Sequence, residues 1–228
     1  MNAVNLNPVI TAKKINVVVL ISGGGSNLQA LIDGQLAGRL PIHISAVISN
    51  RPDVKGLERA RQAGMHAELL DHKNFDCRES FDAALTLRID NFNADLVVLA
   101  GFMRILTPEF TAHYLGRMLN IHPSLLPKYQ GLNTHQRALD SGDKKHGVSV
   151  HFVTAELDGG PIAIQASVPI QQGDNADTLA LRIQAQEHII YPMAVKWFAE
   201  QRLCMSNNQC LLDQKPLPSC GYQINTTS

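Results

Sequence analysis

The segment from Ile15 to Ser22, which reads INVVVLIS, is a nearly continuous run of apolar and β-branched residues that leads into three glycines, Gly23–Gly25. Such a run is typical of a parallel strand that is buried on both faces of a sheet. From Ser26 to about Leu36 the apolar residues recur with helical spacing. A buried strand, a glycine turn and a helix in this order predict an α/β domain.

The alternation of strand and helix continues through the first half of the chain. It predicts a Rossmann-like, mostly parallel sheet with flanking helices, because parallel strands need crossover connections and these are right-handed. Further strands are expected at residues 43–49, 66–70, 95–100 and 118–121, with helices at 54–63 and 76–91.

The second half carries a different pattern. Two strand-like runs, Gly147–Val153 and Ile162–Ile170, are joined by ELDGGP. They predict an antiparallel hairpin that extends the sheet. A long helix is then expected from about Ala176 to Ala199.

The limits of this helix and of the domain follow from local signals. Asp174 or Asn175 is a suitable N-cap, and Pro192 is expected to kink the helix. After Leu212 the chain becomes polar and contains prolines, which is typical of a loose tail. We expect an N-terminal extension at 1–14, a single domain at 15–212 and a flexible C-terminal tail at 213–228.

Charge and cysteine patterns narrow the class of protein. The 20 basic and 20 acidic residues balance, whereas a general nucleic-acid binder would carry a basic excess. The four cysteines form no CxxC pair, which argues against a zinc site or a disulfide framework. No apolar run has the length of a signal peptide core or a membrane span. We therefore expect a cytoplasmic protein that binds neither nucleic acid nor membrane.

The glycine turn is the first candidate binding site. Glycines before a helix let the backbone approach an anion, and the helix start offers free N–H groups. Leu28 stands where the third glycine of a dinucleotide fingerprint would be, so a phosphomonoester site is the favoured functional interpretation. Arg51 leaves an NADP site formally open, and a tight turn with a serine cap is the structural alternative.

A second candidate lies in the segment LNIHPSLLP, where a parallel strand is expected to end. Ligands bind at the carboxyl ends of strands in open α/β sheets. Side chains alternate along a strand, so Asn120 and His122 are expected to point the same way, an amide donor beside a titratable imidazole. A lone loop histidine is more often structural, and the pairing with Asn120 favours a functional one.

Three further segments carry weaker signals. Asp158, in LDGGP, is either part of an ordinary hairpin turn or a carboxylate on a mobile loop that pairs with an imidazole. The segment Asp95–Arg104 ends a buried strand with groups that suit a flat heterocycle, although core packing explains it as well. Gln184 and Glu187 share one helix face and bind either solvent or a ribose or amine.

Four motifs together, in their order and spacing, resemble the glycinamide ribonucleotide formyltransferase family of folate-dependent enzymes. They are ISGGGSN, LAGFMRIL, LNIHPSLLPKY and LDGGP, and the resemblance covers about Ile15 to Leu212. It implies transfer of a formyl group from 10-formyltetrahydrofolate, as cosubstrate, to the amine of glycinamide ribonucleotide in purine (IMP) synthesis. It also implies small-molecule substrates, no metal, and a monomer or weak homodimer.

The resemblance also implies roles for individual residues. The catalytic positions are Asn120, His122 and Asp158. The ribonucleotide is expected to bind at Gly25, Ser26, Asn27, Gln184 and Glu187. The folate is expected to bind at Arg78, Met103, Arg104, Ile105 and Leu106, together with Asn120 and Asp158.

Two positions depart from the family pattern. Asn133 stands where a histidine is usual, and Gln130 replaces a common proline. Both concern ligand positioning in the loop after SLLP, and we expect the reaction to stay with Asn120, His122 and Asp158.

Two alternatives remain. One is another formyl-folate enzyme, such as a hydrolase or a methionyl-tRNA formyltransferase, which would be expected to carry an additional domain. The other is a non-catalytic nucleotide-binding module, which would leave the Asn–His pair and the Asp158 loop without a role.

Overall fold

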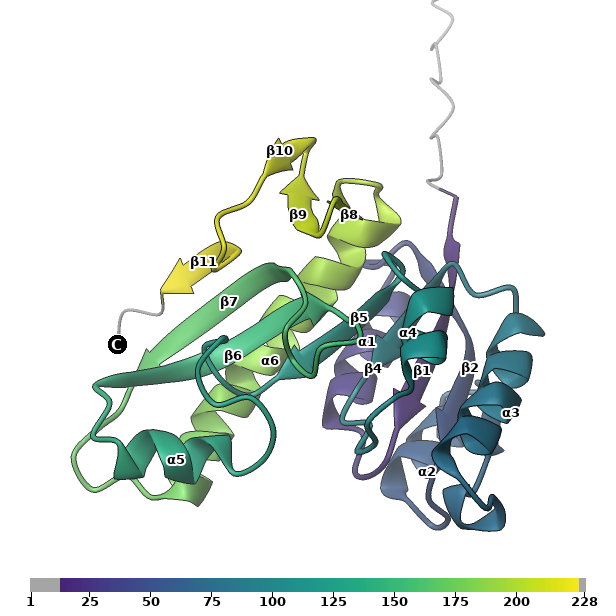
Figure 1. Cartoon of the computed structure of the whole chain (residues 1–228), viewed down its shortest axis with the longest axis horizontal. Coiled ribbons are helices and arrows are strands. Elements are labelled where there is room, and N and C mark those ends of the chain that lie inside the picture. Colours follow the sequence, from purple (N-terminus) through teal and green to yellow (C-terminus); the bar gives the residue numbers. More distant parts are fainter. Residues whose placement is uncertain (1–12, 226–228) are drawn as a thin grey trace, which may run out of the picture.

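A computed structural model of the chain describes residues 13–225, and its centre is one eight-stranded sheet (Figure 1). Along the sheet the order is β11-β7-β6-β5-β4-β1-β2-β3. The strands β5, β4, β1, β2 and β3, which are neighbours in this order, pair in parallel. Strand β6 is antiparallel to both β5 and β7. The strands are β1 (Ile15–Ile21), β2 (Ile42–Ser49), β3 (Ala67–Leu69), β4 (Leu96–Leu99), β5 (Met118–His122), β6 (Lys145–Phe152), β7 (Ile162–Pro169) and β11 (Tyr222–Asn225).

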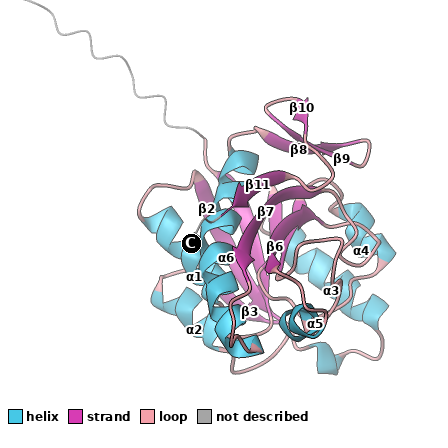
Figure 2. Cartoon of the chain, turned by 90° about the vertical axis from the view of Figure 1, so that its left-hand side faces the viewer, coloured by secondary structure: helices cyan, strands magenta, loops and turns pink. Residues whose placement is uncertain are grey.

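Helices cover both faces of the sheet (Figure 2). One face carries α1, α2 and α6, and the other carries α3 and α4. The helices are α1 (Ser26–Leu36), α2 (Lys55–Gln62), α3 (Arg78–Asp90), α4 (Pro108–His113), α5 (Thr134–Asp140) and α6 (Ala176–Ala199). The predicted Rossmann-like fold with a C-terminal hairpin and a long helix is therefore confirmed.

The first strand shows why the sheet has helices on both sides. Its side chains alternate between two core clusters, as they must in an extended strand. Val17, Val19 and Ile21 pack with α1 and α6, whereas Val18 and Leu20 pack with α3 and α4. All five side chains are fully buried, which explains the unbroken apolar run in the sequence.

Helix α6 begins at one of the two expected cap residues. Asn175 is the N-cap and forms a capping box with Thr178. Pro192 lies inside the helix, which continues to Ala199.

Helices α4 and α5, which have six and seven residues, were not predicted from the sequence. Both are too short to show a helical period. Only their starts carry a signal: Thr107 caps α4 by accepting from the backbone N–H of Phe110, and Pro108 occupies its first turn.

The expected loose tail after Leu212 is wrong for residues 213–225. The strands β8 (Leu203–Ser206), β9 (Gln209–Leu212) and β10 (Lys215–Pro216) form a small antiparallel sheet, and β11 then joins the main sheet in parallel with β7. A polar segment can do this because backbone hydrogen bonds need no apolar side chains. The pairing covers the edge of β7 that would otherwise be open. Residues 1–12 and 226–228 lie outside the described part of the chain.

We expect deletion of residues 218–228 to destabilise the protein. It would remove β11, the contact between Tyr222 and Trp197, and the partly buried Ile224 that packs on the core. A loss of at least about 1 kcal/mol, or about 2–4 °C in Tm for a chain of this size, should be measurable by thermal unfolding. Deletion of residues 226–228 alone is the control, and equal Tm values for the two deletions would contradict the role given to β11.

Candidate active site

The carboxyl ends of β1, β4 and β5 meet at one edge of the sheet, because these strands are parallel. The segments that leave this edge are the glycine turn after β1, residues 100–107 after β4 and the loop of residues 123–133 after β5. All three carry residues singled out from the sequence.

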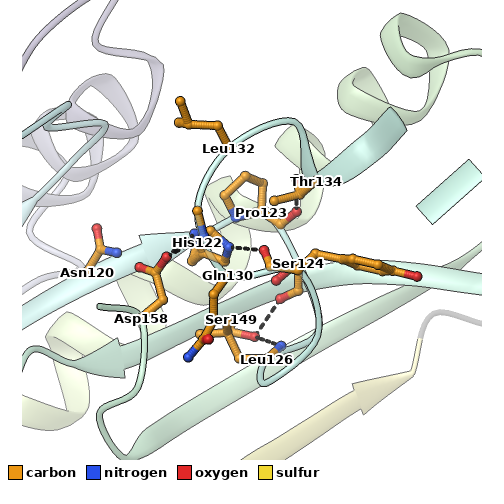
Figure 3. Close-up of polar contacts among 12 residues, drawn as sticks. Asn120, His122, Pro123, Ser124, Leu126, Gln130, Leu132, Thr134, Ser149 and Asp158 are labelled. Atoms are coloured by element: carbon orange, nitrogen blue, oxygen red, sulfur yellow. Dashed lines mark hydrogen bonds and ion pairs between the residues drawn. The ribbon is translucent and has the colours of Figure 1, made fainter. Parts of the chain in front are cut away.

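The structure brings Asn120, His122 and Asp158 together at this edge (Figure 3). Asn120 and His122 lie on β5, and Asp158 comes from the loop between β6 and β7. The carboxylate Oδ2 of Asp158 lies 3.5 Å from Nδ1 of His122, and both side chains are 8% exposed. The predicted convergence of these residues, far apart in sequence, is present in the fold.

The hydrogen bonds of His122 assign its two ring nitrogens. Nε2 lies 2.9 Å from the carbonyl oxygen of Tyr129, which can only accept, so Nε2 carries a proton. The other ring nitrogen, Nδ1, faces the carboxylate of Asp158. Asp158 is itself held in place, because its Oδ2 accepts a hydrogen bond of 2.9 Å from the backbone N–H of Gly131.

His151 was not predicted as a site residue from the sequence. It lies directly across from Asn120 in the β5–β6 pairing. Its Nδ1 lies 2.9 Å from the carbonyl oxygen of Phe152 and must donate to it. Burial lowers the pKa of His151, so the ring is neutral and its Nε2 accepts from Nδ2 of Asn120 at 3.1 Å. This contact fixes the amide orientation of Asn120 and leaves one amide proton for a ligand. The sequence signal that could have indicated His151 was a polar residue at an alternate position of a buried strand, β6.

The turn after β1 forms an open cradle at the start of α1. Gly25 is the N-cap residue and adopts a left-handed conformation with φ 70°. The first backbone N–H groups of a helix have no partner within it and attract anions. A Cβ atom added at Gly23 or Gly24 would meet no other atom within 4 Å, so the backbone at these two residues is accessible.

Helix α6, which is distant in sequence, contributes two side chains beside this cradle. Gln184 donates a 3.1 Å hydrogen bond to the hydroxyl of Ser26, and Asn27 donates one of 2.8 Å to the carboxylate of Glu187. Burial raises the pKa of Glu187, and the bond from Asn27 offsets part of that rise. Among the described residues Oδ1 of Asn27 is buried without a partner. The two sets of predicted ribonucleotide contacts therefore lie side by side.

The residues expected to bind folate form a third part of the edge. Arg104, Ile105 and Leu106 line a cavity of about 110 Å³ that also includes Asn120 and Asp158. Met103 is anchored through its backbone N–H, which donates a 2.7 Å hydrogen bond to the hydroxyl of Ser22. Met103 is 57% exposed and does not line the cavity.

Arg78, like Met103, lies outside the cavity lining. It is the first residue of α3 and is exposed. Its guanidinium lies 3.8 Å from Glu79.

The two positions that depart from the family pattern have backbone roles. Asn133 adopts a left-handed conformation with φ 58° at the start of α5, a conformation that asparagine tolerates better than most residues. The carbonyl of Gln130 accepts a 2.6 Å hydrogen bond from Arg137. In residues 13–225 no group of three or more His, Cys, Asp or Glu side chains is placed to hold a metal ion.

Comparison with known proteins identifies the family. The formyl transferase family model matches residues 15–195. A phosphoribosylglycinamide formyltransferase from Escherichia coli is 56% identical over 208 residues, which are 91% of this chain and 98% of that protein. The enzyme of the same name from Haemophilus influenzae is 49% identical over 90% of this chain and 97% of its own length. The chain belongs to the phosphoribosylglycinamide formyltransferases of the formyl transferase family.

A solved formyltransferase structure has the same fold. The phosphoribosylglycinamide formyltransferase from Coxiella burnetii superposes with a TM-score of 0.88 at 52% identity, covering 92% of this chain and 99% of that one. The part of the chain matched by the family model contains the candidate site described above, from the turn after β1 to Glu187. No helix among residues 13–225 has both the length and the hydropathy needed to span a membrane.

Proposed function

We propose that this formyltransferase transfers the formyl group of 10-formyltetrahydrofolate to the amine of glycinamide ribonucleotide, giving formylglycinamide ribonucleotide and tetrahydrofolate in purine synthesis. The observation that carries the proposal is the contact between His122 and Asp158 beside Asn120, at the sheet edge that also carries the glycine cradle and a cavity lined by both apolar and polar side chains. The cradle suits the phosphate of the ribonucleotide, with Gly25, Ser26, Asn27, Gln184 and Glu187 around it. Met103, Arg104, Ile105, Leu106 and Arg78 are the proposed folate contacts.

The first step is attack by the neutral amine on the formyl carbon. A C–N bond forms and the formyl oxygen becomes an oxyanion. Protonated His122 and the free amide proton of Asn120 are the donors for that oxygen. Preorganised donors of this kind contribute about 3–4 kcal/mol each to transition-state stabilisation. The carboxylate of Asp158, whose Oδ2 lies 3.5 Å from Nδ1 of His122, is placed to pair with the protonated ring.

The second step is collapse of the tetrahedral intermediate. The bond between the formyl carbon and N10 of the folate breaks, the attacking amine loses a proton and N10 gains one. We propose that the carboxylate of Asp158 relays this proton through water. No covalent bond to the enzyme forms at any point, since the amine itself is the nucleophile.

A direct assay separates this function from its alternatives. Purified protein is incubated with 10-formyltetrahydrofolate, with and without glycinamide ribonucleotide, and both formylated ribonucleotide and free formate are measured by mass spectrometry. We expect formylated ribonucleotide and tetrahydrofolate in equal amounts, and no turnover without the acceptor. Formate released without acceptor would indicate a hydrolase, and no reaction in either mixture would indicate a binding module.

The unusual asparagine gives a second test. We expect Asn133→His to change the single-turnover rate by less than about tenfold, which is about 1.4 kcal/mol of barrier. Asn133 is exposed and its backbone conformation, rather than its side chain, places the start of α5. A parent protein that is nearly inactive until Asn133→His restores it would make position 133 part of the catalytic set.

Both proposed substrates are small soluble molecules, so we propose that the protein acts in the cytoplasm without nucleic acid or membrane partners.

A further inference from the structure

A buried carboxylate lies on α3, outside the catalytic group. Asp82 is 2% exposed and shares the buried face of α3 with Phe81, Leu85 and Ile89. Burying an ionised group in such a layer is costly unless the group is paired. One oxygen, Oδ2, accepts a 2.7 Å hydrogen bond from the backbone N–H of Thr107. The other, Oδ1, is buried and has no hydrogen-bond partner among the described residues.

A hydrogen-bond donor without a partner lies on the segment from Arg104 to Thr107, to which Asp82 is bonded. The Nε atom of Arg104 is also buried and has no partner among the described residues. The guanidinium of Arg104 lies over the ring of Phe81, with Cζ 4.6 Å from the ring centroid. The adjacent residues Phe81 and Asp82 thus both face the segment from Arg104 to Thr107, one through its ring and the other through its carboxylate.

The electrostatics of Asp82 agree with this arrangement. Burial raises the pKa of Asp82, and the hydrogen bonds from Thr107 together with the positive charges of Arg104 and Arg78 act against that rise. The carboxylate is therefore close enough to both arginines to respond to their charge. An arginine beside a carboxylate prefers paired N–H···O contacts in one plane, so a fixed carboxylate also fixes the plane of the guanidinium.

We propose that Asp82 is a positioning residue for folate recognition: its free Oδ1 accepts from the Nε–H of Arg104 in the folate complex and turns the terminal NH₂ groups toward the ligand's carboxylate. The inference rests on the proposed function, since it assigns Arg104 to a carboxylate of the formyl-folate. Asp82 touches no substrate in this arrangement. It acts through Arg104, with Phe81 as the surface on which the guanidinium rests.

The test is Asp82→Asn, which keeps the shape of the side chain and an acceptor for the Thr107 N–H. The second position becomes an NH₂ donor, which cannot accept from Arg104. We expect the KM for 10-formyltetrahydrofolate to rise about tenfold or more, as for loss of one charged hydrogen bond. The kcat and the KM for the ribonucleotide should change by less than about twofold, well below that effect.

Two comparisons separate positioning from a general structural defect. Glu109→Gln removes one negative charge from an exposed position of α4 and should leave all constants unchanged. A formylated pteroate substrate, which lacks the glutamate carboxylates, should be used equally well by the parent and by Asp82→Asn. An equal rise in KM for both folate substrates would overturn the proposal, as would an unchanged KM for the full substrate.

A second variant keeps the inference testable if Asp82→Asn fails to fold. Arg104→Lys retains the positive charge but lacks the Nε–H, so it should raise the KM for the full folate substrate and leave that for the pteroate unchanged. Normal folate binding by Arg104→Lys would contradict the proposal. Inactivity of the parent toward the ribonucleotide would instead refute the proposed function, so the two failures are distinguishable.

Discussion

Replacement of His122 with alanine is expected to lower kcat by about 10³-fold, with both KM values changed little. Loss of a single preorganised oxyanion donor costs about 10²–10³-fold in comparable sites. Here the substitution also removes the partner of Asp158, whose Oδ2 lies 3.5 Å from Nδ1. Because the donor acts on charge that exists only in the transition state, the effect falls on kcat rather than on substrate binding. Single-turnover rates of parent and variant measure it directly.

The matched control is His43→Ala, which removes an exposed imidazole from β2. Its kcat should equal that of the parent. Thermal unfolding of both variants would show that His122→Ala is folded. A folded His122→Ala protein that keeps more than about a tenth of the parent kcat would contradict the assignment of His122 as a catalytic donor, because so small a loss is only about 1.4 kcal/mol.

Replacement of Gly25 with valine is expected to raise the KM for the ribonucleotide by about 30–100-fold, which corresponds to about 2–3 kcal/mol of strain or displacement. The residue has φ +70°, and a Cβ there would lie 2.8 Å from the Cα of Gly56. Both effects move the backbone N–H groups that form the anion cradle. The KM for the folate should stay nearly constant, since the folate cavity is lined by other segments. Initial rates over a matrix of both substrate concentrations provide the two KM values.

Gly64→Val is the control for backbone strain. Gly64 has nearly the same conformation, φ +71°, but a Cβ there would meet nothing within 4 Å. It follows α2 and lies outside the glycine turn. The control should lose stability without a change in either KM. Equal increases in both KM values for Gly25→Val would count against a dedicated phosphate site.

Much of the fold is encoded in local patterns, and this is why it could be predicted. Strand β1 and helix α1 were expected almost to the residue, because a strand buried on both faces leaves an unbroken apolar run before the glycines. Helix α6 was expected from its length and from Asn175, which caps it. Short elements such as α4 carry too few residues to show a period. Strand β11 was missed because its pairing with β7 depends on the edge of a strand far away in sequence.

The residues of the site also differ in whether a local sequence pattern reveals them. Asn120 and His122 were paired correctly from strand alternation alone. The approach of Asp158 to His122 depends on the register of β6 and β7, so from the residues alone it was one of two interpretations of LDGGP, and the resemblance favoured it. His151 escaped attention because its partner, Asn120, lies on a neighbouring strand. Asp82 gave no signal, because a single acid on a helix is ordinarily a surface residue and its burial is a property of the packed sheet.

The most direct measurement of the central claim follows the formyl oxygen. The enzyme is given 10-formyltetrahydrofolate labelled with ¹⁸O in the formyl group, together with glycinamide ribonucleotide in ordinary water, and the product is analysed by mass spectrometry after one turnover. Direct attack at the site of Asn120, His122 and Asp158 predicts that the formylated ribonucleotide keeps the label, because the oxyanion collapses by breaking only the bond to N10. Unlabelled product, or labelled formate released in its place, would contradict direct transfer to the amine.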